Sequence, residues 1–195
     1  MTMLADVLYN RKLILASGSP RRRFFLEDLG LRFEVRIKEV KESFPEHLKG
    51  KEISEFLAKL KASPFLGDLN ENEILITADT IVWLDDRALG KPKDKREAQK
   101  MLRSLSNKNH QVISSVALTT TNRQIIFSDI TEVSFKKLTD DEINYYIDTY
   151  KPFDKAGAYG IQEWLGYIGI ESIRGSYFNV VGFPVQKFYK ALHKI

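Results

Sequence analysis

Apolar residues recur along this chain with two different periods. One stretch follows the i, i+3, i+4, i+7 spacing that is typical of an amphipathic helix, at Ile53, Phe56, Leu57 and Leu60. The segment 74–84 is instead nearly continuous in apolar and β-branched residues, which predicts an interior strand. Polar residues interrupt this predicted strand at Thr77, Asp79 and Thr80.

Polar signals and glycines indicate where other elements begin and end. An apolar run at 12–16 predicts a strand, followed by a turn at Ser17 to Ser19. Ser19 at an N-cap before Pro20 predicts a helix that runs to about Leu29, and Gly30 ends it. Two capping-box patterns predict further helix starts, at Asp94 with Glu97 and at Thr139 with Glu142.

The second half of the chain alternates between the same two patterns. We expect a hairpin of strands at 111–119 and 124–135, and a strand at 165–173. The helix after Thr139 should bury Ile143, Tyr146, Ile147 and Tyr150, and a last helix should bury Val185, Phe188, Tyr189 and Leu192. This order predicts an α/β protein with a mixed, twisted sheet and flanking helices. At 195 residues, the chain suits one large domain or two small lobes that share a core.

Composition narrows the classes of function. The chain has no cysteine, which excludes disulfides, thiolate nucleophiles and cysteine-based zinc sites and fits a cytoplasmic protein. No stretch is apolar enough for a signal-peptide core or a membrane helix. The net charge of +4 and the pI of about 9.1 suit an anionic ligand. Because there is no Lys/Arg-rich tail or stripe, a small polyanion is favoured over nucleic acid.

The turn and helix start at Ser17 to Arg23 are the first candidate site. A helix N-terminus attracts anions, serine hydroxyls can donate hydrogen bonds, and the guanidinium groups of Arg21 and Arg22 can hold phosphate oxygens. The alternative is a plain helix cap followed by a solvated basic face.

Asp79 is the second candidate. A carboxylate within an apolar strand is unfavourable unless a metal ion or a basic residue pairs with it. If the partner is Mg²⁺, the carboxylate can hold the ion and help to deprotonate an attacking water. The alternative is an aspartate at a strand end that accepts hydrogen bonds from nearby backbone amides.

Three further signals are weak when each is taken alone. Lys61 lies at the edge of the apolar stripe that ends at Leu60, where it either leans into a cleft or only extends its stem along the surface. Lys91 lies in a stiff turn before a proline. The glycine-containing segment 154–162 allows close backbone approach to a ligand, and Gln162 has both a donor and an acceptor for a nucleobase edge. An ordinary packed connection would show the same residues.

Taken together and in order, these segments resemble the Maf family of nucleotide pyrophosphatases. The resemblance extends from about Leu13 to Leu192, and it treats residues 1–195 as a single Maf-like domain. It rests on Ala16-Ser17-Gly18-Ser19-Pro20-Arg21-Arg22, Leu57-Ala58-Lys59-Leu60-Lys61-Ala62, Ala78-Asp79-Thr80-Ile81-Val82, Gly90-Lys91-Pro92, His110-Gln111-Val112, Lys155-Ala156-Gly157-Ala158-Tyr159-Gly160-Ile161-Gln162, Gly175-Ser176-Tyr177 and Val181-Gly182-Phe183-Pro184.

The resemblance implies a set of roles. Asp79 would accept the proton of the attacking water, and Glu42 with Asp79 would hold a divalent cation, Mg²⁺ or Mn²⁺. Lys61 and Lys91 would neutralise the charge that leaves with pyrophosphate. The substrate-binding residues would be Ser17, Ser19, Arg21, Arg22, Thr80, Lys155 and Gln162. It further implies two lobes around a cleft, a relation to inosine-triphosphate pyrophosphatases, and a homodimer.

The segment 155–162 resembles the branch of the family that hydrolyses dTTP and UTP to the monophosphate and pyrophosphate. Glu163 and Trp164 depart from the pattern, because many relatives carry glycine after the glutamine. Two alternatives stay open at this point: a 7-methyl-GTP pyrophosphatase, and a non-catalytic nucleotide-binding regulator of cell division. We expect a nucleoside triphosphate as the substrate and no membrane partner, and nucleic acid is disfavoured as a partner.

Overall fold

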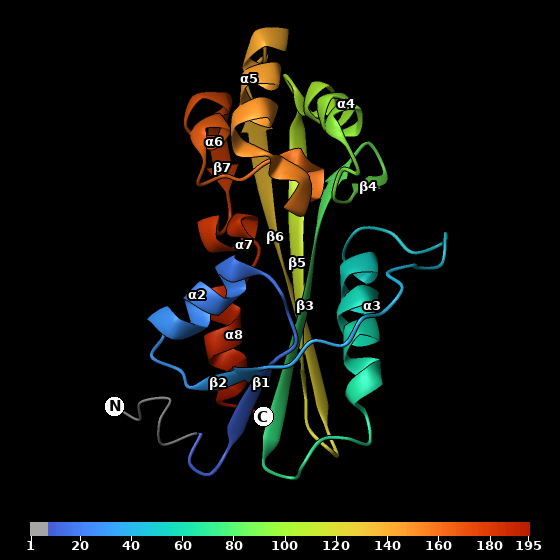
Figure 1. The fold of residues 1–195 in the computed structure, drawn as a ribbon, viewed down its shortest axis with the longest axis vertical. Helices are drawn as coiled ribbons and strands as arrows, with labels where there is room; N and C mark the ends of the chain where they lie inside the picture. The colour runs from blue at the N-terminus through green and yellow to red at the C-terminus, as the bar shows by residue number, and fades with distance from the viewer. Residues whose placement is uncertain (1–7) are drawn as a thin grey trace. The chain divides into compact units, whose positions relative to one another are not determined.

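The computed structural model of the chain describes residues 8–195, and its ribbon is shown in Figure 1. A seven-stranded sheet has the strand order β2-β1-β3-β5-β6-β7, with β4 paired to β3. The strands are β1 (Lys12–Leu15), β2 (Phe33–Val35), β3 (Glu73–Leu84), β4 (Arg87–Leu89), β5 (Asn109–Thr119), β6 (Gln124–Phe135) and β7 (Ile170–Arg174). The α-helices are α2 (Pro20–Asp28), α3 (Lys51–Ala62), α4 (Lys95–Leu105), α5 (Asp140–Tyr150), α6 (Trp164–Gly169), α7 (Tyr177–Val181) and α8 (Val185–Leu192). Short 3-10 helices are η1 (Ser63–Phe65), η2 (Pro152–Asp154) and η3 (Ala156–Ala158).

The described chain forms two compact units. Unit 1 contains residues 8–79, 114–129 and 182–195, and unit 2 contains residues 80–113 and 130–181. Strands β3, β5 and β6 each contribute residues to both units. The predicted mixed sheet is confirmed, because β1 is parallel to β2 and β3, whereas β4 is antiparallel to β3 and β7 to β6. None of the helices in residues 8–195 combines the length and the apolar character that crossing a membrane requires.

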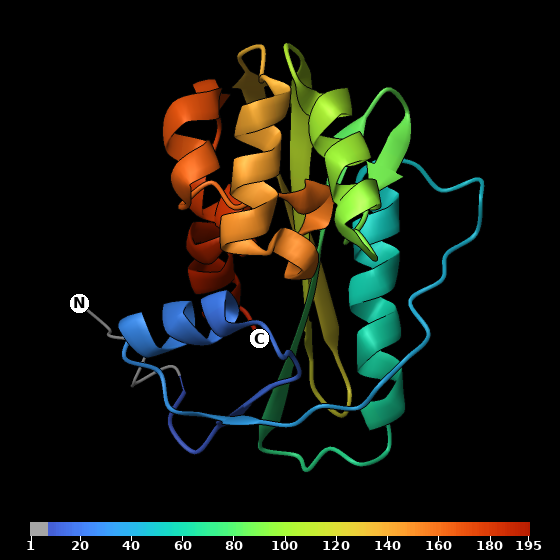
Figure 2. The same cartoon turned by 45° about the horizontal axis from the view of Figure 1, so that its top comes forward.

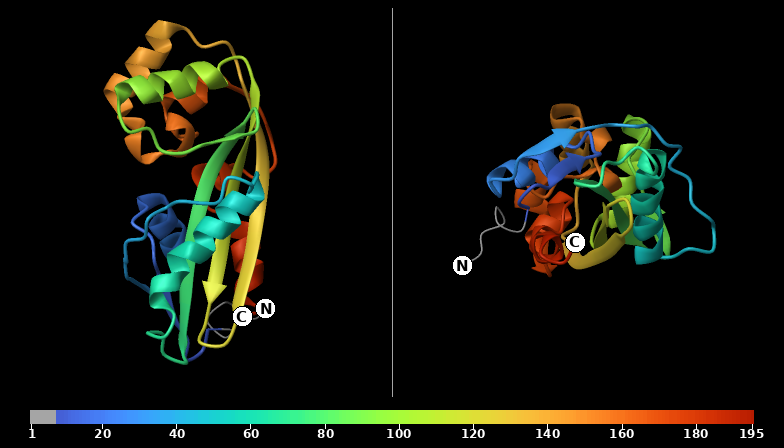
Figure 3. Two further views of the ribbon diagram at one scale, coloured as in Figure 1. Left: turned by 90° about the vertical axis from the view of Figure 1, so that its right-hand side faces the viewer. Right: turned by 90° about the horizontal axis from the view of Figure 1, so that it is seen from below.

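In unit 1, helices cover both faces of the strands, as Figure 3 shows for α3 and α8. Ile14 and Leu75 are register partners on β1 and β3, and both pack with Ala62 and Phe65 on the α3 side. Because successive strand residues point to opposite faces, the equally buried neighbours of Ile14 and Leu75 face the other side. On α2, the ring of Phe25 stacks on Phe183.

Helix α3 is also connected to the sheet of unit 1 by hydroxyl groups. The Oγ atoms of Ser54 on α3 and Ser115 on β5 lie 2.6 Å apart, and those of Ser115 and Ser128 on β6 lie 2.9 Å apart. The hydroxyl of Ser128 donates to the carboxylate of Glu55 on α3 at 2.6 Å. Every member of this chain of hydroxyls therefore has a partner, as a buried polar group requires.

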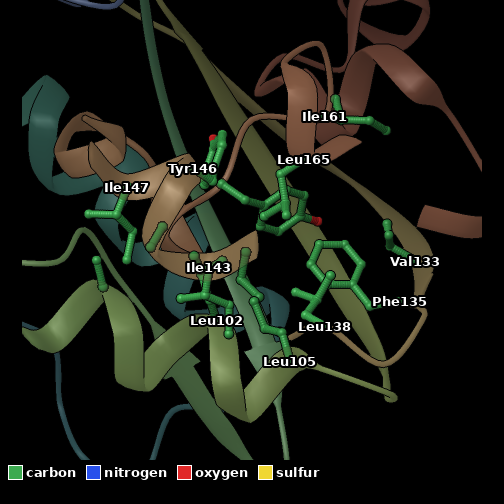
Figure 4. Close-up of a cluster of buried hydrophobic side chains, with 14 of the residues drawn as sticks. Leu102, Leu105, Val133, Phe135, Leu138, Ile143, Tyr146, Ile147, Ile161 and Leu165 are labelled. Carbon is green, nitrogen blue, oxygen red and sulfur yellow. The ribbon is translucent and has the colours of Figure 1, made fainter. Parts of the chain in front are cut away.

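Unit 2 has its own apolar core. Helices α4 and α5 lie side by side in Figures 1 and 2, and their inner faces contribute to the cluster in Figure 4. The core side chains labelled there are Leu102, Leu105, Val133, Phe135, Leu138, Ile143, Tyr146, Ile147, Ile161 and Leu165. The capping box that begins α5 is confirmed, since Thr139 and Glu142 each accept a backbone N–H from the other. Tyr150, which was expected to face inward, is exposed at the end of α5.

The strand predicted at 165–173 is wrong over its first half. Residues 164–169 form α6, and only Ile170–Arg174 forms a strand, β7. A Cβ at Gly166 would lie 1.8 Å from the carbonyl oxygen of Ile161, so the glycine lets this turn pack closely against the preceding segment. Within α6, the spacing of Leu165, Ile168 and Gly169 turns apolar residues toward the core. A short apolar run fits a strand and a buried helix equally well.

Two predicted helix caps differ in detail from the structure. Helix α2 begins at Pro20 as predicted, but the side chain of Ser19 makes no capping hydrogen bond, and the Ser17 hydroxyl accepts the Ser19 N–H at 3.3 Å instead. At α4, Asp94 accepts the Glu97 N–H at 2.8 Å, as expected. The Glu97 carboxylate, however, accepts from the N–H of Lys93 and not from that of Asp94.

The buried face predicted for the last helix, α8, is only partly found. Phe188 and Leu192 are buried as expected, whereas Val185 and Tyr189 are half-buried.

Candidate active site

Asp79 lies on β3, on the face of the strand that α3 covers. Two residues earlier, the Thr77 hydroxyl donates to the carbonyl oxygen of Ala58 on α3 at 2.7 Å, which fixes the helix against this strand. Because side chains two apart share a face, Asp79 points toward α3 as well. Its carboxylate accepts from the ammonium of Lys61 on α3 at 2.6 Å. Side chains of a helix lean toward its N-terminus, so the long Lys61 stem reaches back along α3 to this carboxylate.

Burial dominates the chemistry of this carboxyl group. Asp79 is only 6% exposed, and burial raises its pKa above the usual value for aspartate. The charges of Lys61 and Arg22 act in the opposite direction, while the nearby charge of Glu42 raises the pKa further. A carboxylate with a raised pKa is a stronger base than an exposed one, so this position suits a proton acceptor.

Glu42 approaches the same ammonium group from the loop between β2 and α3. One oxygen of Glu42 lies 3.2 Å from Nζ of Lys61, and the Glu42 side chain is 45% exposed. Two carboxylates of unit 1 therefore converge on one cation. No cluster of three or more histidine, aspartate or glutamate residues in positions 8–195 forms a metal site by itself. Two carboxylates nevertheless fit Mg²⁺, which in nucleotide enzymes often uses one or two protein carboxylates plus water and phosphate oxygens.

Arg22 connects the start of α2 to the neighbourhood of Asp79. Its Nη1 donates to the carbonyl oxygen of Ala78 at 2.8 Å and to the Ser17 hydroxyl at 3.2 Å, and its Nε donates to the carbonyl oxygen of Gly182 at 3.1 Å. Burial lowers the pKa of Arg22 to about 10, and the charge of Asp79 opposes that shift. The structure thus brings the predicted residues Ser17 and Arg22 to the backbone next to Asp79.

The beginning of α2 offers backbone donors in the same part of unit 1. The N–H groups at the first turn of a helix lack helical partners, and the helix dipole adds partial positive charge there. Ser19 and Arg21 are half-buried at this turn, and the charge of Arg21 contributes to the lowered pKa of Arg22. A group of cations and helical N–H donors beside a buried carboxylate can bind a phosphate chain and accept a proton next to it.

The remaining predicted residues belong to unit 2. Thr80 follows Asp79 on β3 and is half-buried. Lys91 is exposed in the turn after β4, and the preceding Gly90 accepts the N–H of Gly157 at 3.0 Å. The turn that carries Lys91 and the segment that leads to Gln162 are therefore held together within this unit.

The segment 155–163 shows contacts that its sequence did not indicate. The Lys155 ammonium is bound by the carboxylates of Asp154 at 2.7 Å and Glu163 at 3.0 Å, and Lys155 is buried. The phenol of Tyr146 donates to Glu163 and accepts the N–H of Gly160 at 2.9 Å. Tyr146 was expected only as a core residue, although a buried tyrosine hydroxyl usually signals a hydrogen-bond partner.

Gln162 is held through its main chain. Its carbonyl oxygen accepts from the hydroxyl of Tyr167 on α6 at 2.7 Å. The side-chain oxygen Oε1 is buried and has no hydrogen-bond partner among residues 8–195. Since buried acceptors in proteins are nearly always satisfied, this atom is suited to receive a donor from a ligand.

Known proteins match this chain over nearly its whole length. A protein named dTTP/UTP pyrophosphatase from Flavobacterium psychrophilum is 59% identical over 187 residues, which cover 96% of each chain. A second protein with that name, from Christiangramia forsetii, is 54% identical over 193 residues that cover 99% of this chain and 98% of the relative. Among solved structures, a dITP/XTP pyrophosphatase from Mycobacterium abscessus matches with 15% identity and a TM-score of 0.45, and the match covers 92% of this chain and 91% of that one.

The family model described as "Maf-like protein" matches residues 12–195. This match includes the loop before α2, the strand β3 with Asp79, and the segment that ends at Gln162. Together with relatives that are more than half identical over at least 96% of their length, it establishes that the chain belongs to the Maf family.

Proposed function

We propose that this protein is a nucleoside-triphosphate pyrophosphatase that hydrolyses dTTP and UTP to the monophosphate and pyrophosphate. The observation that carries the proposal is the buried carboxylate of Asp79, held at 2.6 Å from Lys61 and next to the backbone that Arg22 binds. The names of the relatives from Flavobacterium psychrophilum and Christiangramia forsetii support the choice of substrate.

In the proposed reaction, water attacks the α-phosphorus, and the bond from that phosphorus to the bridging oxygen breaks. Asp79 accepts the proton that the water loses, and its raised pKa makes it a suitable base. Arg21, Arg22 and the first turn of α2 bind the phosphate oxygens, with the hydroxyls of Ser17 and Ser19 as further donors. Lys61 balances negative charge that develops on the departing pyrophosphate.

The carboxylates of Glu42 and Asp79 are the residues that would hold a divalent cation, Mg²⁺ or Mn²⁺. When bound, such an ion neutralises phosphate charge and lowers the pKa of a coordinated water. Lys61 Nζ lies between the two carboxylates, at 3.2 Å from Glu42 and 2.6 Å from Asp79, which fits a position that takes positive charge.

Gln162 supplies a physical basis for recognition of the base. Thymine and uracil both carry an imide N–H donor at N3, where cytosine has an acceptor. The buried Oε1 of Gln162, which lacks a partner among the described residues, would accept that N–H, whereas an acceptor from cytosine would leave it unsatisfied.

The predicted contributions of Thr80, Lys91 and Lys155 to substrate binding stay predictions, as do the homodimer, the cytoplasmic location and the single domain over residues 1–195.

The proposal is tested by measuring pyrophosphate release from dTTP, UTP, dCTP and 7-methyl-GTP, with Mg²⁺, with Mn²⁺ and with EDTA. We expect metal-dependent release from dTTP and UTP. Preference for 7-methyl-GTP would identify the other branch of the family, and nucleotide binding without any cleavage would favour the regulator of cell division.

Asp79→Asn tests the proton acceptor. It should lower kcat by about 10²–10⁴-fold, the usual contribution of a general base, without loss of folded structure. Asp86→Asn, an exchange of the same chemistry at an exposed turn, is the matched control and should retain full activity. Near-normal turnover of the Asp79 variant would exclude the proposed role.

A further inference from the structure

A polar network is buried in unit 2 beneath the segment that carries Gln162. At its centre is the Tyr146 phenol, which donates to Glu163 and accepts the Gly160 N–H at 2.9 Å. Glu163 in turn binds the Lys155 ammonium at 3.0 Å. Figure 4 shows the side chain of Tyr146 within the apolar cluster of this unit. The network therefore joins helix α5 to both ends of the segment 155–163.

Stability alone does not require these polar groups. Tyr146 is fully buried, and a phenylalanine would fill the same volume without burying a hydroxyl. A buried ion pair such as Lys155 with Glu163 contributes little more than well-packed apolar residues would. Directional contacts do, however, fix the position of a backbone more narrowly than apolar packing does.

The backbone at Gly160 lies directly against this ion pair. A Cβ at Gly160 would approach Cδ of Glu163 to 2.9 Å and Cε of Lys155 to 3.0 Å, which is closer than nearly all Cβ contacts in proteins. Two residues later, the Gln162 carbonyl oxygen is held by the Tyr167 hydroxyl at 2.7 Å. The main chain is thus fixed on both sides of Gln162, while the Gln162 Oε1 keeps no partner among the described residues.

We propose that Tyr146 and Glu163 are positioning residues for base recognition: they hold the backbone at Gly160 so that the side-chain oxygen of Gln162 can accept a hydrogen bond from the base. Lys155 belongs to this support and acts through Glu163. The inference rests on the proposed function, in which Gln162 accepts the imide N–H of thymine or uracil. It assigns a role in selectivity to Glu163, a residue at which the chain departs from the resemblance to its family.

The test compares the binding of two monophosphates, dTMP and dCMP, by calorimetry. They differ at N3 and C4 of the ring and in the 5-methyl group, and dUMP in the same series removes the methyl difference. The variants are Tyr146→Phe, which deletes only the hydroxyl, and Glu163→Gln, which keeps an acceptor for Tyr146 but removes the charge that binds Lys155. Tyr145→Phe is the matched control, because it deletes a hydroxyl from an exposed tyrosine of the same helix.

We expect the wild-type protein and Tyr145→Phe to prefer dTMP and dUMP over dCMP to the same extent. Tyr146→Phe should narrow that preference about fivefold or more, the effect of one misdirected hydrogen bond, and Glu163→Gln should narrow it less. A merely structural role would lower the melting temperature but leave the ratio of the two affinities unchanged.

An unchanged ratio in Tyr146→Phe, with the protein still folded, would overturn the inference. So would a wild-type protein that binds dTMP and dCMP equally, because there would be no selectivity to support. The proposed function is judged separately, by pyrophosphate release from the wild-type protein. Binding of monophosphates requires no turnover, so the two proposals can fail independently.

Discussion

Lys61→Met separates charge from packing at the buried carboxylate of unit 1. Methionine keeps most of the apolar stem but removes the ammonium that lies 2.6 Å from Asp79. The Asp79 side chain is 8% exposed, so its carboxylate would remain buried without its nearest cation. Breaking a buried ion pair from one side usually costs about 3–5 kcal/mol. Because the Lys61 side chain is itself 17% exposed and water reaches it, we expect about 2–3 kcal/mol.

The loss of stability in Lys61→Met should depend on pH with a definite sign. Burial already raises the pKa of Asp79, and Lys61 is the first of the groups that lower it. Without Lys61, the pKa in the folded state rises further. Because the folded state then binds the Asp79 proton more tightly than the unfolded state does, this group contributes stability at low pH. The contribution is fully present below the pKa of the unfolded state, about 4, and is lost as the pH rises through the pKa of the folded state. The variant should therefore be weakest relative to wild type at pH 8 and approach it near pH 5.

The assay is thermal unfolding at pH 8 and pH 5. For a chain of this length, the expected loss corresponds to a melting temperature lower by about 5–10 °C at pH 8. Lys59→Met, at an exposed position of the same helix, is the control and should change little. The double variant Lys61→Met with Asp79→Asn buries no charge at this pair and should recover most of the stability. Equal losses at both pH values, or a double variant as weak as Lys61→Met, would refute the reasoning.

Two further predictions concern unit 1. Arg22→Lys cannot keep the hydrogen bonds to Ala78 and Gly182 together, and it should lose about 2 kcal/mol in chemical denaturation; a loss no larger than that of the exposed Arg23→Lys would contradict this. The hydrogen bonds of Arg36 hold the pKa of buried Glu73 at about 2, below its usual value of 4.5. The pair therefore stabilises the folded state at pH values above 4.5, and this contribution disappears as the pH falls toward 2. Glu73→Gln should accordingly be less stable than wild type in urea at pH 7 by about 1–2 kcal/mol, with the gap closing at pH 3.

The sequence predicted best the helices that have a long apolar period or a complete capping box. Helix α3 follows the i, i+3, i+4, i+7 spacing over Ile53 to Leu60, and α5 begins at a complete capping box. The segment 165–173 failed because its apolar run allowed two conformations. The choice between them depends on the close packing of Gly166 against Ile161, five residues earlier, a spacing that neither helical periodicity nor strand alternation marks.

The sequence identified residues of the candidate site, but it did not identify the partners that these residues contact in the folded chain. An aspartate inside an apolar strand requires a partner, and the sequence left open whether this is a metal ion or a basic residue. The structure places Lys61 at Asp79, with Glu42 on the same ammonium. Tyr146 and Glu163 could not be identified as partners, because they are 17 positions apart and neither helical spacing nor strand alternation relates them.

The hydroxyl chain beneath α3 has a consequence for how unit 1 tolerates change. An apolar helix face can slide along a sheet by a fraction of a turn and repack, since dispersion contacts have little direction. The contacts of Ser54 with Ser115, and of Ser128 with Glu55, cannot follow such a shift without leaving buried oxygens unpaired. These hydrogen bonds therefore fix the position of α3 along the sheet. Lys61 lies about two turns from Ser54 on the same helix, so its position relative to Asp79 depends in part on hydroxyl groups that do not bind Asp79.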